Sequence, residues 1–233
     1  MPNFSVRSTL LEKMDEPDLP EHELRQNLRE LETVNTLLGG YSVVLNALSR
    51  MHWGSESVRI MDMGCGGGDM LRAISKWAKQ KGHNVSLTGI DYNPVMIQFA
   101  TEHSQSYKDI DYRQLSIFDE QLLTERTDII VCSLFCHHFK NEELIPLLKR
   151  MKSIATKAII INDVHRHWFA YYAIGILTSI FSKTYLVKHD AKLSVARAFK
   201  RKDLEEIMKA ADIAHYSLNW RWAWRWELII NIS

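Results

Sequence analysis

Cysteine is scarce in this sequence, with Cys65, Cys132 and Cys136 the only three among 233 residues. An odd number of cysteines at spacings that match no zinc motif supports neither a disulfide framework nor a metal site, so no metal is expected. Free thiols in apolar surroundings are typical of a reducing compartment, and we therefore expect a cytoplasmic protein.

Long uncharged apolar runs are also missing. The nearest one, residues 168–181, is bounded by Arg166 and His167 on one side and by Lys183 on the other. Its length suits a buried or interfacial helix better than a membrane span, and the N-terminal residues contain no secretory apolar region. We expect a soluble chain without an integral membrane span, while peripheral contact with lipid through this helix stays open.

The chain has almost no net charge, because 29 Lys and Arg residues balance 28 Asp and Glu residues to give +1. No global field attracts DNA or RNA, so nucleic acid is not expected as a partner. Hydrophobic residues make up 46% and charged residues 24% of the sequence, which is typical of a globular protein. The length suits one α/β domain with a small elaboration.

From residue 58 onward, apolar strand-like runs alternate with helical segments. The expected strands are residues 58–63, 85–90, 111–115, 128–133 and 157–162, and the expected helices are residues 70–81, 94–103 and 141–154. This alternation predicts a parallel, doubly wound α/β sheet. The nearly continuous apolar runs 129–131 and 158–161 indicate strands that are covered on both faces.

The segment before this core predicts helices. Apolar residues recur at helical spacing from Leu24 to Leu38, and Gly39 and Gly40 then end that helix. We expect residues 1–50 to form an N-terminal helical cap and residues 51–233 to form the ligand-binding domain.

After Asp163 the sequence predicts a long apolar helix, a polar stretch over residues 188–200, and a helix over residues 202–211. Residues 164–200 are expected to form an insertion of helix and loop over the active site. Two antiparallel strands are expected within residues 214–232. Four tryptophans alternate there, and a period of two predicts that they share one face of a strand; they are Trp220, Trp222, Trp224 and Trp226.

A glycine-rich turn at residues 64–68 joins the first expected strand to the next helix. Glycine allows positive φ angles and close approach of the backbone to a ligand, and the helix N-terminus adds oriented N–H donors. The second strand then ends at Asp91, where a nucleoside-binding fold places the acid that holds the ribose. The two features in one βαβ unit indicate a nucleoside cofactor.

NAD is the main alternative cofactor. The dinucleotide motif G-x-G-x-x-G requires a third glycine, but that position is Asp69 when counted from Gly64 and Leu71 when counted from Gly66. An acid at the start of the helix would also repel a pyrophosphate. S-adenosylmethionine (SAM) carries no phosphate and tolerates this acid.

Residues 62–68, an acid followed by glycines at alternate positions, resemble the first motif of class I SAM-dependent methyltransferases. Residues 112–117 and 128–139 resemble later motifs of that family, and residues 24–40 and 189–199 are similar to a bacterial subgroup that methylates small molecules. The resemblance implies a Rossmann-like sheet of seven strands, mainly parallel with an antiparallel last strand, and SAM as cofactor. It implies cofactor contacts at Asp62, Gly64, Cys65, Gly66, Gly68, Asp91, Tyr92, Ser116, Ile117, Ser133 and Leu134.

The candidate catalytic residues lie after the fourth and fifth expected strands. His137 and His138 follow one strand and Asp163 ends the next, at the carboxyl edge where such sheets bind ligands. Histidine is the usual base near neutral pH, so we select His138 first, then His137 and Asp163, with His165 as a further candidate. The structural alternatives are that the histidines cap a helix and that Asp163 holds loop N–H groups.

The expected function is methyl transfer from SAM to a small, apolar metabolite, most simply at oxygen. The 168–181 helix is either core or the wall of an apolar acceptor site, to which Trp168, Phe169, Tyr171 and Tyr172 would contribute. The alternatives are a non-catalytic SAM-binding sensor or assembly partner, an NAD(P)-dependent reductase, and a peripheral membrane protein. The acceptor, the atom methylated and the oligomeric state are left open by the sequence.

Overall fold

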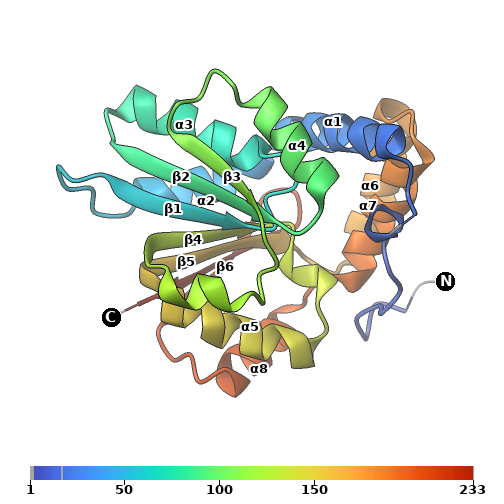
Figure 1. Cartoon of the computed structure of the whole chain (residues 1–233). Coiled ribbons are helices and arrows are strands. Elements are labelled where there is room, and N and C mark those ends of the chain that lie inside the picture. Colours follow the sequence, from blue (N-terminus) through green and yellow to red (C-terminus); the bar gives the residue numbers. More distant parts are fainter. Residues whose placement is uncertain (1–2, 17, 233) are drawn as a thin grey trace.

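The computed structural model, which describes residues 3–16 and 18–232, contains a seven-stranded sheet with helices on both faces (Figure 1). The strand order is β3-β2-β1-β4-β5-β7-β6, and β7 runs antiparallel to its two neighbours. The strands are β1 (Val58–Met63), β2 (Val85–Asp91), β3 (Ile110–Gln114), β4 (Thr127–Ser133), β5 (Ala155–Val164), β6 (Tyr216–Arg221) and β7 (Arg225–Asn231). The expected doubly wound fold with an antiparallel last strand is confirmed.

The helices form two layers and a cap (Figure 1). They are α1 (Glu21–Leu37), α2 (Gly40–Ser49), α3 (Asp69–Lys81), α4 (Pro94–His103), α5 (Asn141–Ile154), α6 (Trp168–Phe181), α7 (Tyr185–Arg197) and α8 (Arg201–Ala210). Helices α2 and α3 contribute to the core on one face of the sheet, and α5 and α8 contribute to the core on the other.

Successive side chains of the central strands point alternately into these two cores. In β4, Ile129 and Val131 pack in the core with α2 and α3, whereas Ile130 and Cys132 pack in the core with α5 and α8. Both faces of β4 are therefore buried, which explains its continuous apolar run. Each aliphatic side chain buried in this way stabilises the fold by about 1.5–3 kcal/mol.

The C-terminal hairpin places its tryptophans differently from the prediction. Trp220 on β6 and Trp226 on β7 lie directly opposite each other, but Trp222 and Trp224 belong to the turn between the strands. Ala223 and Trp224 adopt positive φ angles of 62° and 52°, so the chain reverses there. The prediction that all four tryptophans share one face of a strand was wrong.

The cap lies over the carboxyl ends of the parallel strands. It combines α1, α6, α7 and the residues before α1, and α7 contacts both α1 and the 3-10 helix η1 (Lys13–Asp15). The polar stretch 188–200 turns out to be mostly helical, as part of α7. Its buried side includes Asp190 and Arg197 besides apolar residues. The polar composition of this segment therefore does not mean that it is exposed.

Helix α6 has an apolar exterior. Trp168, Ile176 and Ile180 on its outer side are 57%, 64% and 70% exposed. Across the part of the chain that the structure describes, no helix combines the length and apolar character needed to cross a membrane.

Candidate active site

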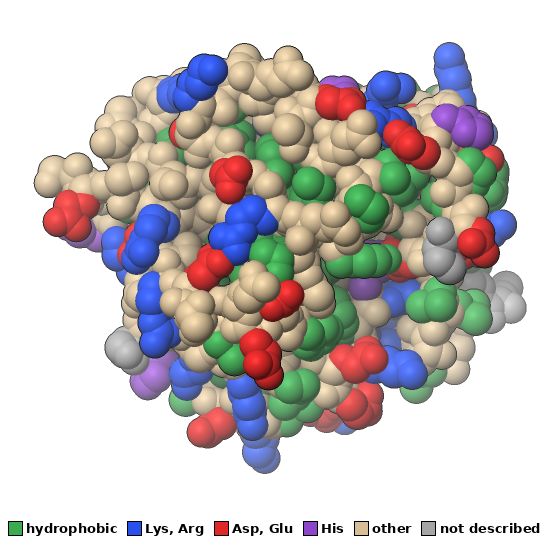
Figure 2. Space-filling view, in the orientation of Figure 1, with side chains coloured by type: hydrophobic (Ala, Val, Ile, Leu, Met, Phe, Trp, Pro, Cys, Tyr) green, Lys and Arg blue, Asp and Glu red, His purple; other side chains and the backbone are tan. Residues whose placement is uncertain are grey.

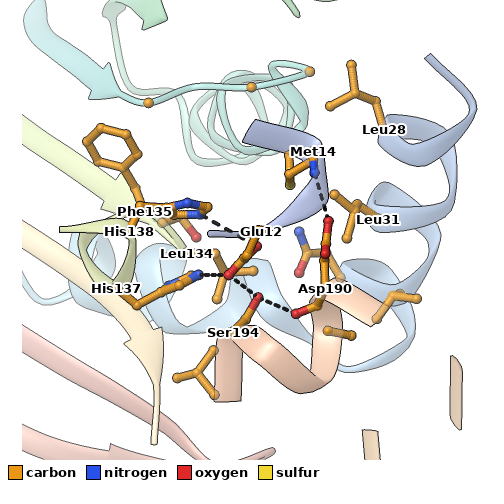
Figure 3. Close-up of a pocket in the computed structure, with 18 of the residues that line it drawn as sticks. Glu12, Met14, Leu28, Leu31, Leu134, Phe135, His137, His138, Asp190 and Ser194 are labelled. Atoms are coloured by element: carbon orange, nitrogen blue, oxygen red, sulfur yellow. Dashed lines mark hydrogen bonds and ion pairs between the residues drawn. The ribbon is translucent and has the colours of Figure 1, made fainter. Parts of the chain in front are cut away.

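A cavity of about 530 Å³ lies between the strand ends and the cap. Figure 2 shows hydrophobic side chains gathered around a hollow on this face of the molecule, and Figure 3 shows the interior. Sites for small molecules and cofactors usually measure about 300–1,000 Å³. The cavity is lined from the sheet side by Gly64, Cys65, Gly66, Asp91, Tyr92, Ser116, Ile117, Ser133, Leu134, Phe135, His137 and His138.

The glycine turn after β1 is shaped to admit a ligand. Gly64 has a φ of 74°, and a Cβ atom there would lie 2.1 Å from the ring of Phe135, so only glycine fits. The backbone N–H groups of Gly64 and Cys65 both donate to the carbonyl oxygen of Ile90. This anchors the turn beside β2 and leaves the backbone at Gly66 facing open space.

Asp91 at the end of β2 occupies the predicted ribose position. Its Oδ2 accepts from the N–H of Gly66 and its Oδ1 from the N–H of Asn93, each at 3.0 Å. Burial raises the pKa of this carboxyl above its ordinary value. Each oxygen retains capacity for another hydrogen bond, and the residue lines the cavity, so the carboxylate can accept from the two hydroxyls of a ribose.

Two expected cofactor contacts lie outside the main cavity. Asp62 borders a small separate pocket with Asn35, Tyr41 and Asp69, and burial, followed by the nearby Asp69 and Asp91, raises the pKa of its carboxyl well above the ordinary value. Gly68 caps α3 with a φ of 73°, and a Cβ there would lie 2.2 Å from the hydroxyl of Tyr112. The nine other expected contacts line the cavity.

Leu134, directly after β4, holds an uncommon backbone conformation at the centre of the site. Its φ is 53°, a left-handed conformation that costs a non-glycine residue of order 1–3 kcal/mol. The N–H of Leu134 donates to the carbonyl oxygen of Asn162 on β5 at 2.8 Å, which holds the residue in place. The strain pre-organises the turn that presents the two histidines.

His137 is a buried imidazole between two carboxylates. Its Nδ1 lies 2.7 Å from Oδ1 of Asp163, and its Nε2 lies 3.4 Å from Oε1 of Glu12. Burial would lower the pKa of His137, but the carboxylates of Asp163 and Glu12 outweigh burial and raise it to about 10. The same contacts lower the pKa of Glu12 to about 2 against the effect of its burial.

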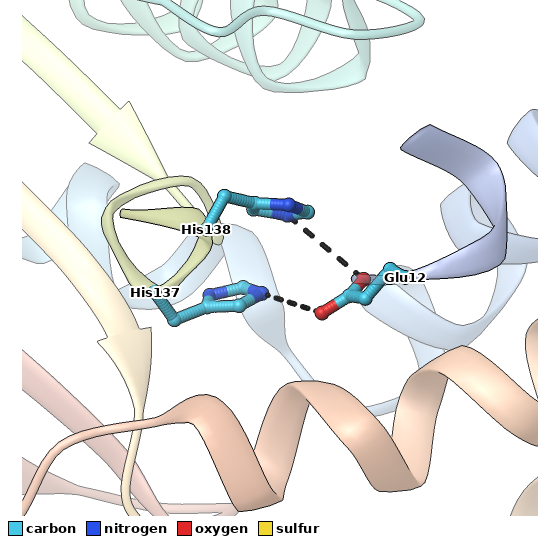
Figure 4. A group of neighbouring side chains, drawn as sticks. All are labelled: Glu12, His137 and His138. Carbon is cyan, nitrogen blue, oxygen red and sulfur yellow. Dashed lines mark ion pairs between the residues drawn. The ribbon is translucent and has the colours of Figure 1, made fainter. Parts of the chain in front are cut away.

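His138 stands beside His137 and is held in the same way. Its Nδ1 lies 2.8 Å from Oδ2 of Asp15, and its Nε2 lies 3.9 Å from Oε2 of Glu12. Both imidazoles therefore point their Nε2 atoms toward one carboxylate, as Figure 4 shows. Of the three candidate catalytic residues, the two histidines line the cavity and Asp163 supports His137 from behind.

Two arginines hold the turn that carries these histidines, η3 (Cys136–His138). The guanidinium of Arg7 donates to the carbonyl oxygens of His137 and Phe139, and that of Arg197 donates to those of His137 and His138. The two imidazoles are thus fixed through their own backbone as well as through their Nδ1 atoms. His165, the further candidate, does not line the cavity.

The sequence analysis missed several polar residues of the site. They are Glu12, Asp15, Asp190, Ser194 and Arg225. Asp190 accepts from the backbone N–H groups of Lys13 and Met14, and Ser194 donates to Glu12 at 2.9 Å. These bonds join α7 to η1 and position Glu12 (Figure 3). No local motif surrounds Glu12, so only its contacts with residues far away in the sequence show that it belongs to the site.

Arg225 at the start of β7 is a buried cation on the cavity wall. Among the described residues no hydrogen-bond partner is found for its Nε and Nη1 atoms, although Nη2 donates to Asn35. Burial lowers the pKa of Arg225 to about 10, against the pull of Asp163 and other nearby acids. A buried guanidinium with two nitrogen atoms left without a partner is costly, so this position suits an anionic group of a ligand.

The cap side of the cavity is mainly apolar. It is lined by Leu28, Leu31, Val34, Leu38, Ala170, Ala173, Ile174, Leu177 and Val195. The alternative in which Trp168, Phe169, Tyr171 and Tyr172 form this wall was wrong, because none of the four lines the cavity and three of them, Trp168, Phe169 and Tyr172, are largely exposed. Small and aliphatic residues of the inner side form it instead.

The comparisons with known proteins agree with this geometry. Residues 60–157 match the family described as a methyltransferase domain. The ubiquinone biosynthesis O-methyltransferase of Pasteurella multocida (strain Pm70) is 22% identical over 183 residues, which cover 74% of this chain and 68% of that protein.

Solved structures share the fold at low sequence identity. A SAM-dependent methyltransferase from Aquifex aeolicus aligns with a TM-score of 0.64 at 16% identity, covering 90% of this chain and 98% of that one. The plantazolicin methyltransferase BpumL, in complex with S-adenosylhomocysteine (SAH), also aligns with a TM-score of 0.64 at 16% identity, covering 91% and 95%. The CMeT domain of the citrinin polyketide synthase aligns with a TM-score of 0.57 at 16% identity, covering 79% of this chain, which spans about half (48%) of that chain.

The cofactor half of the cavity fits the group that these proteins share. It offers a buried carboxylate that can accept from a ribose, a glycine turn open to a ligand, and a buried guanidinium whose Nε and Nη1 atoms have no partner among the described residues. Residues 60–157 are thus a methyltransferase domain by their family match, and the sheet order and the glycine motif of the chain agree with the class I SAM-dependent methyltransferase fold.

Proposed function

We propose that this protein transfers the methyl group of SAM to an oxygen atom of a small apolar metabolite. The observation that carries the proposal is the division of one cavity into two halves. Glycine backbone and Asp91 line the cofactor half, aliphatic side chains of α1, α6 and α7 line the other half, and two histidines lie between them.

Bound SAM supplies an activated methyl group on its sulfonium, so the protein mainly contributes alignment. Asp91 accepts from the ribose, and Ser133 and Leu134 border the methionine part. Fixing two reactants in this manner is worth effective concentrations of about 10⁵–10⁸ M. The strained turn at Leu134, which the carbonyl of Asn162 holds, fixes the position of the histidines relative to the cofactor wall.

His138, His137 and Asp163 are proposed to act at the acceptor oxygen. Both imidazoles line the cavity, and their Nδ1 atoms are committed to Asp15 and Asp163. Their Nε2 atoms are therefore the ones that can meet an acceptor. The apolar wall opposite excludes water and favours an acceptor with few polar groups.

An oxygen acceptor is supported by the O-methyltransferase among the relatives, although a carbon methyltransferase, CurJ, shares the fold with a TM-score of 0.59. The test is incubation of the protein with methyl-labelled SAM and a panel of apolar phenols, enols and carboxylic acids, with the product identified by NMR. A label bonded to oxygen supports the proposal, and a label bonded to carbon contradicts the choice of atom.

The role of the histidines is tested with His138→Asn. We expect kcat to fall by about 10²–10⁴-fold, the usual size of the contribution of a positioned polar group to proton chemistry, while the affinity for SAH stays unchanged. Turnover equal to wild type would remove His138 from the reaction. No turnover of any acceptor by wild type, with SAH bound tightly, would favour the non-catalytic alternative.

A further inference from the structure

The buried cluster of Glu12, His137 and His138 carries a conclusion beyond methyl transfer itself. The potential ligand atoms of the three residues lie within 4.8 Å of one another. Glu12 and His137 are each 2% exposed. In Figure 4 both rings point toward the Glu12 carboxylate from the same side.

The distances within the cluster suit a shared ion better than direct hydrogen bonds. His137 Nε2 and Glu12 Oε1 are 3.4 Å apart, and within the described chain His137 Nε2 has no hydrogen-bond partner of acceptable geometry. Zinc binds histidine nitrogen at 2.0–2.1 Å and carboxylate oxygen at 2.0–2.2 Å, so two ligands at a tetrahedral angle lie about 3.4 Å apart. Nε2 of His138 lies 3.9 Å from the other Glu12 oxygen, Oε2, and all the potential ligand atoms lie within 4.8 Å of one another, so small side-chain shifts would bring the His138 atom to the same spacing.

The Nδ1 atoms supply the second observation. Histidines that bind a metal almost always donate their other ring N–H to a carboxylate or carbonyl, which fixes the ring and its tautomer. Here both do so, His137 to Asp163 at 2.7 Å and His138 to Asp15 at 2.8 Å. The two Nε2 atoms are thereby left as the ligating atoms.

The charges around the cluster also call for a cation. Three carboxylates, those of Glu12, Asp15 and Asp163, surround the two imidazoles. The guanidiniums of Arg7 and Arg197 donate to backbone carbonyls or to the Asn141 amide rather than to these acids. A divalent ion that takes the place of the proton on Nε2 of His137 would offset two of these three charges.

We propose that Glu12, His137 and His138 bind one divalent transition-metal ion through one carboxylate oxygen and two Nε2 atoms. Two histidines and one carboxylate form a set that binds Zn²⁺ or Fe²⁺ and leaves coordination positions free. All three residues line the cavity, so a free position faces the acceptor half. In the reaction proposed above, on which this step rests, the ion would bind the acceptor oxygen.

The test is binding of Co²⁺ and Zn²⁺ to the untagged full chain after treatment with a chelator. We expect one Co²⁺ per chain with a visible absorption band, and one Zn²⁺ retained through dialysis as measured by elemental mass spectrometry. Glu12→Gln and the less buried His138→Asn should each weaken binding at least 100-fold, and Asp15→Asn by about 10–100-fold through the loss of its support.

His189→Asn is the matched control. The Nδ1 of His189 also pairs with a carboxylate at 2.8 Å, that of Asp190, but the residue is exposed and outside the cluster, so Co²⁺ binding should be unchanged. No stoichiometric binding of either ion by wild type, or equal loss in the control, would overturn the proposal.

Measurement of methyl transfer together with metal binding distinguishes failure of this inference from failure of the proposed function. Turnover that persists in chelator, with no ion bound, would leave methyl transfer intact and reject the ion as the group that receives the acceptor oxygen. Stoichiometric Co²⁺ bound by wild type but lost in Glu12→Gln, without methylation of any acceptor, would keep the metal and reject the proposed reaction.

Discussion

Replacement of Asp91 by asparagine is expected to weaken cofactor binding strongly while leaving the protein folded. The carboxylate accepts one backbone N–H on each oxygen, from Gly66 and Asn93, and its remaining capacity faces the cavity. Asparagine keeps the shape of the side chain but offers one neutral acceptor in place of two charged ones.

The size of the effect follows from these hydrogen bonds. A hydrogen bond to a charged group contributes about 1.5–3 kcal/mol and one to a neutral group about 0.5–1.5 kcal/mol. Exchanging two charged acceptors for one neutral acceptor therefore costs about 2–5 kcal/mol of binding free energy, a roughly 30- to 3,000-fold increase in Kd at 1.4 kcal/mol per tenfold.

The assay is calorimetric titration of SAH and of adenosine, which share the ribose hydroxyls, so both should lose affinity to a similar extent. Asp128→Asn is the control, because Asp128 also accepts a backbone N–H, that of Arg59 at 2.8 Å, but does not line the cavity. An Asp91→Asn protein that binds SAH within threefold of wild type would refute the assignment of the ribose to Asp91.

Two further predictions concern buried charges. Arg225→Met should weaken the binding of SAH at least tenfold but leave that of adenosine unchanged, because the guanidinium, whose Nε and Nη1 atoms have no partner among the described residues, is expected to hold the carboxylate that only SAH carries; equal loss of affinity for both ligands in calorimetry would contradict this. Asp62→Asn should stabilise the ligand-free protein increasingly as pH rises. The pKa of Asp62 is raised well above its ordinary value by burial, so the folded state holds an extra proton and the free energy of unfolding of wild type loses up to about 1.4 kcal/mol per pH unit above about pH 4. Urea denaturation from pH 5 to 8 checks this, and parallel profiles for the two proteins would argue against it.

The cofactor half of the site was predictable because its signals are local. A strand, a glycine turn and a second strand ending in Asp91 lie within about thirty residues, and backbone geometry at Gly64 permits no other residue. The acceptor half is different, since Ser194 donates to Glu12 across 182 positions of sequence and Met14 donates to Asp190 across 176. Nothing in a single sequence marks such a contact.

One helix was not predicted and one local prediction was wrong, each for a physical reason. Helix α7 buries Asp190 and Arg197 on the side where a simple amphipathic helix has apolar residues, so the polar stretch gave no helical pattern. The turn of the C-terminal hairpin uses positive φ at Ala223 and Trp224, where glycine or asparagine is the usual signal. The alternating tryptophans therefore run across a turn between two strands and not along a single strand.

The origin of the two cavity walls has an evolutionary consequence. Nearly all residues of the cofactor wall lie within 60–157, the segment that matches the methyltransferase family. The acceptor wall comes mainly from residues 12–38, 164–195 and 222–224. Substitutions in those flanking segments can alter which molecule is methylated without changing how the methyl donor is held. Selection can therefore explore new acceptors in one set of segments while the donor site is inherited intact.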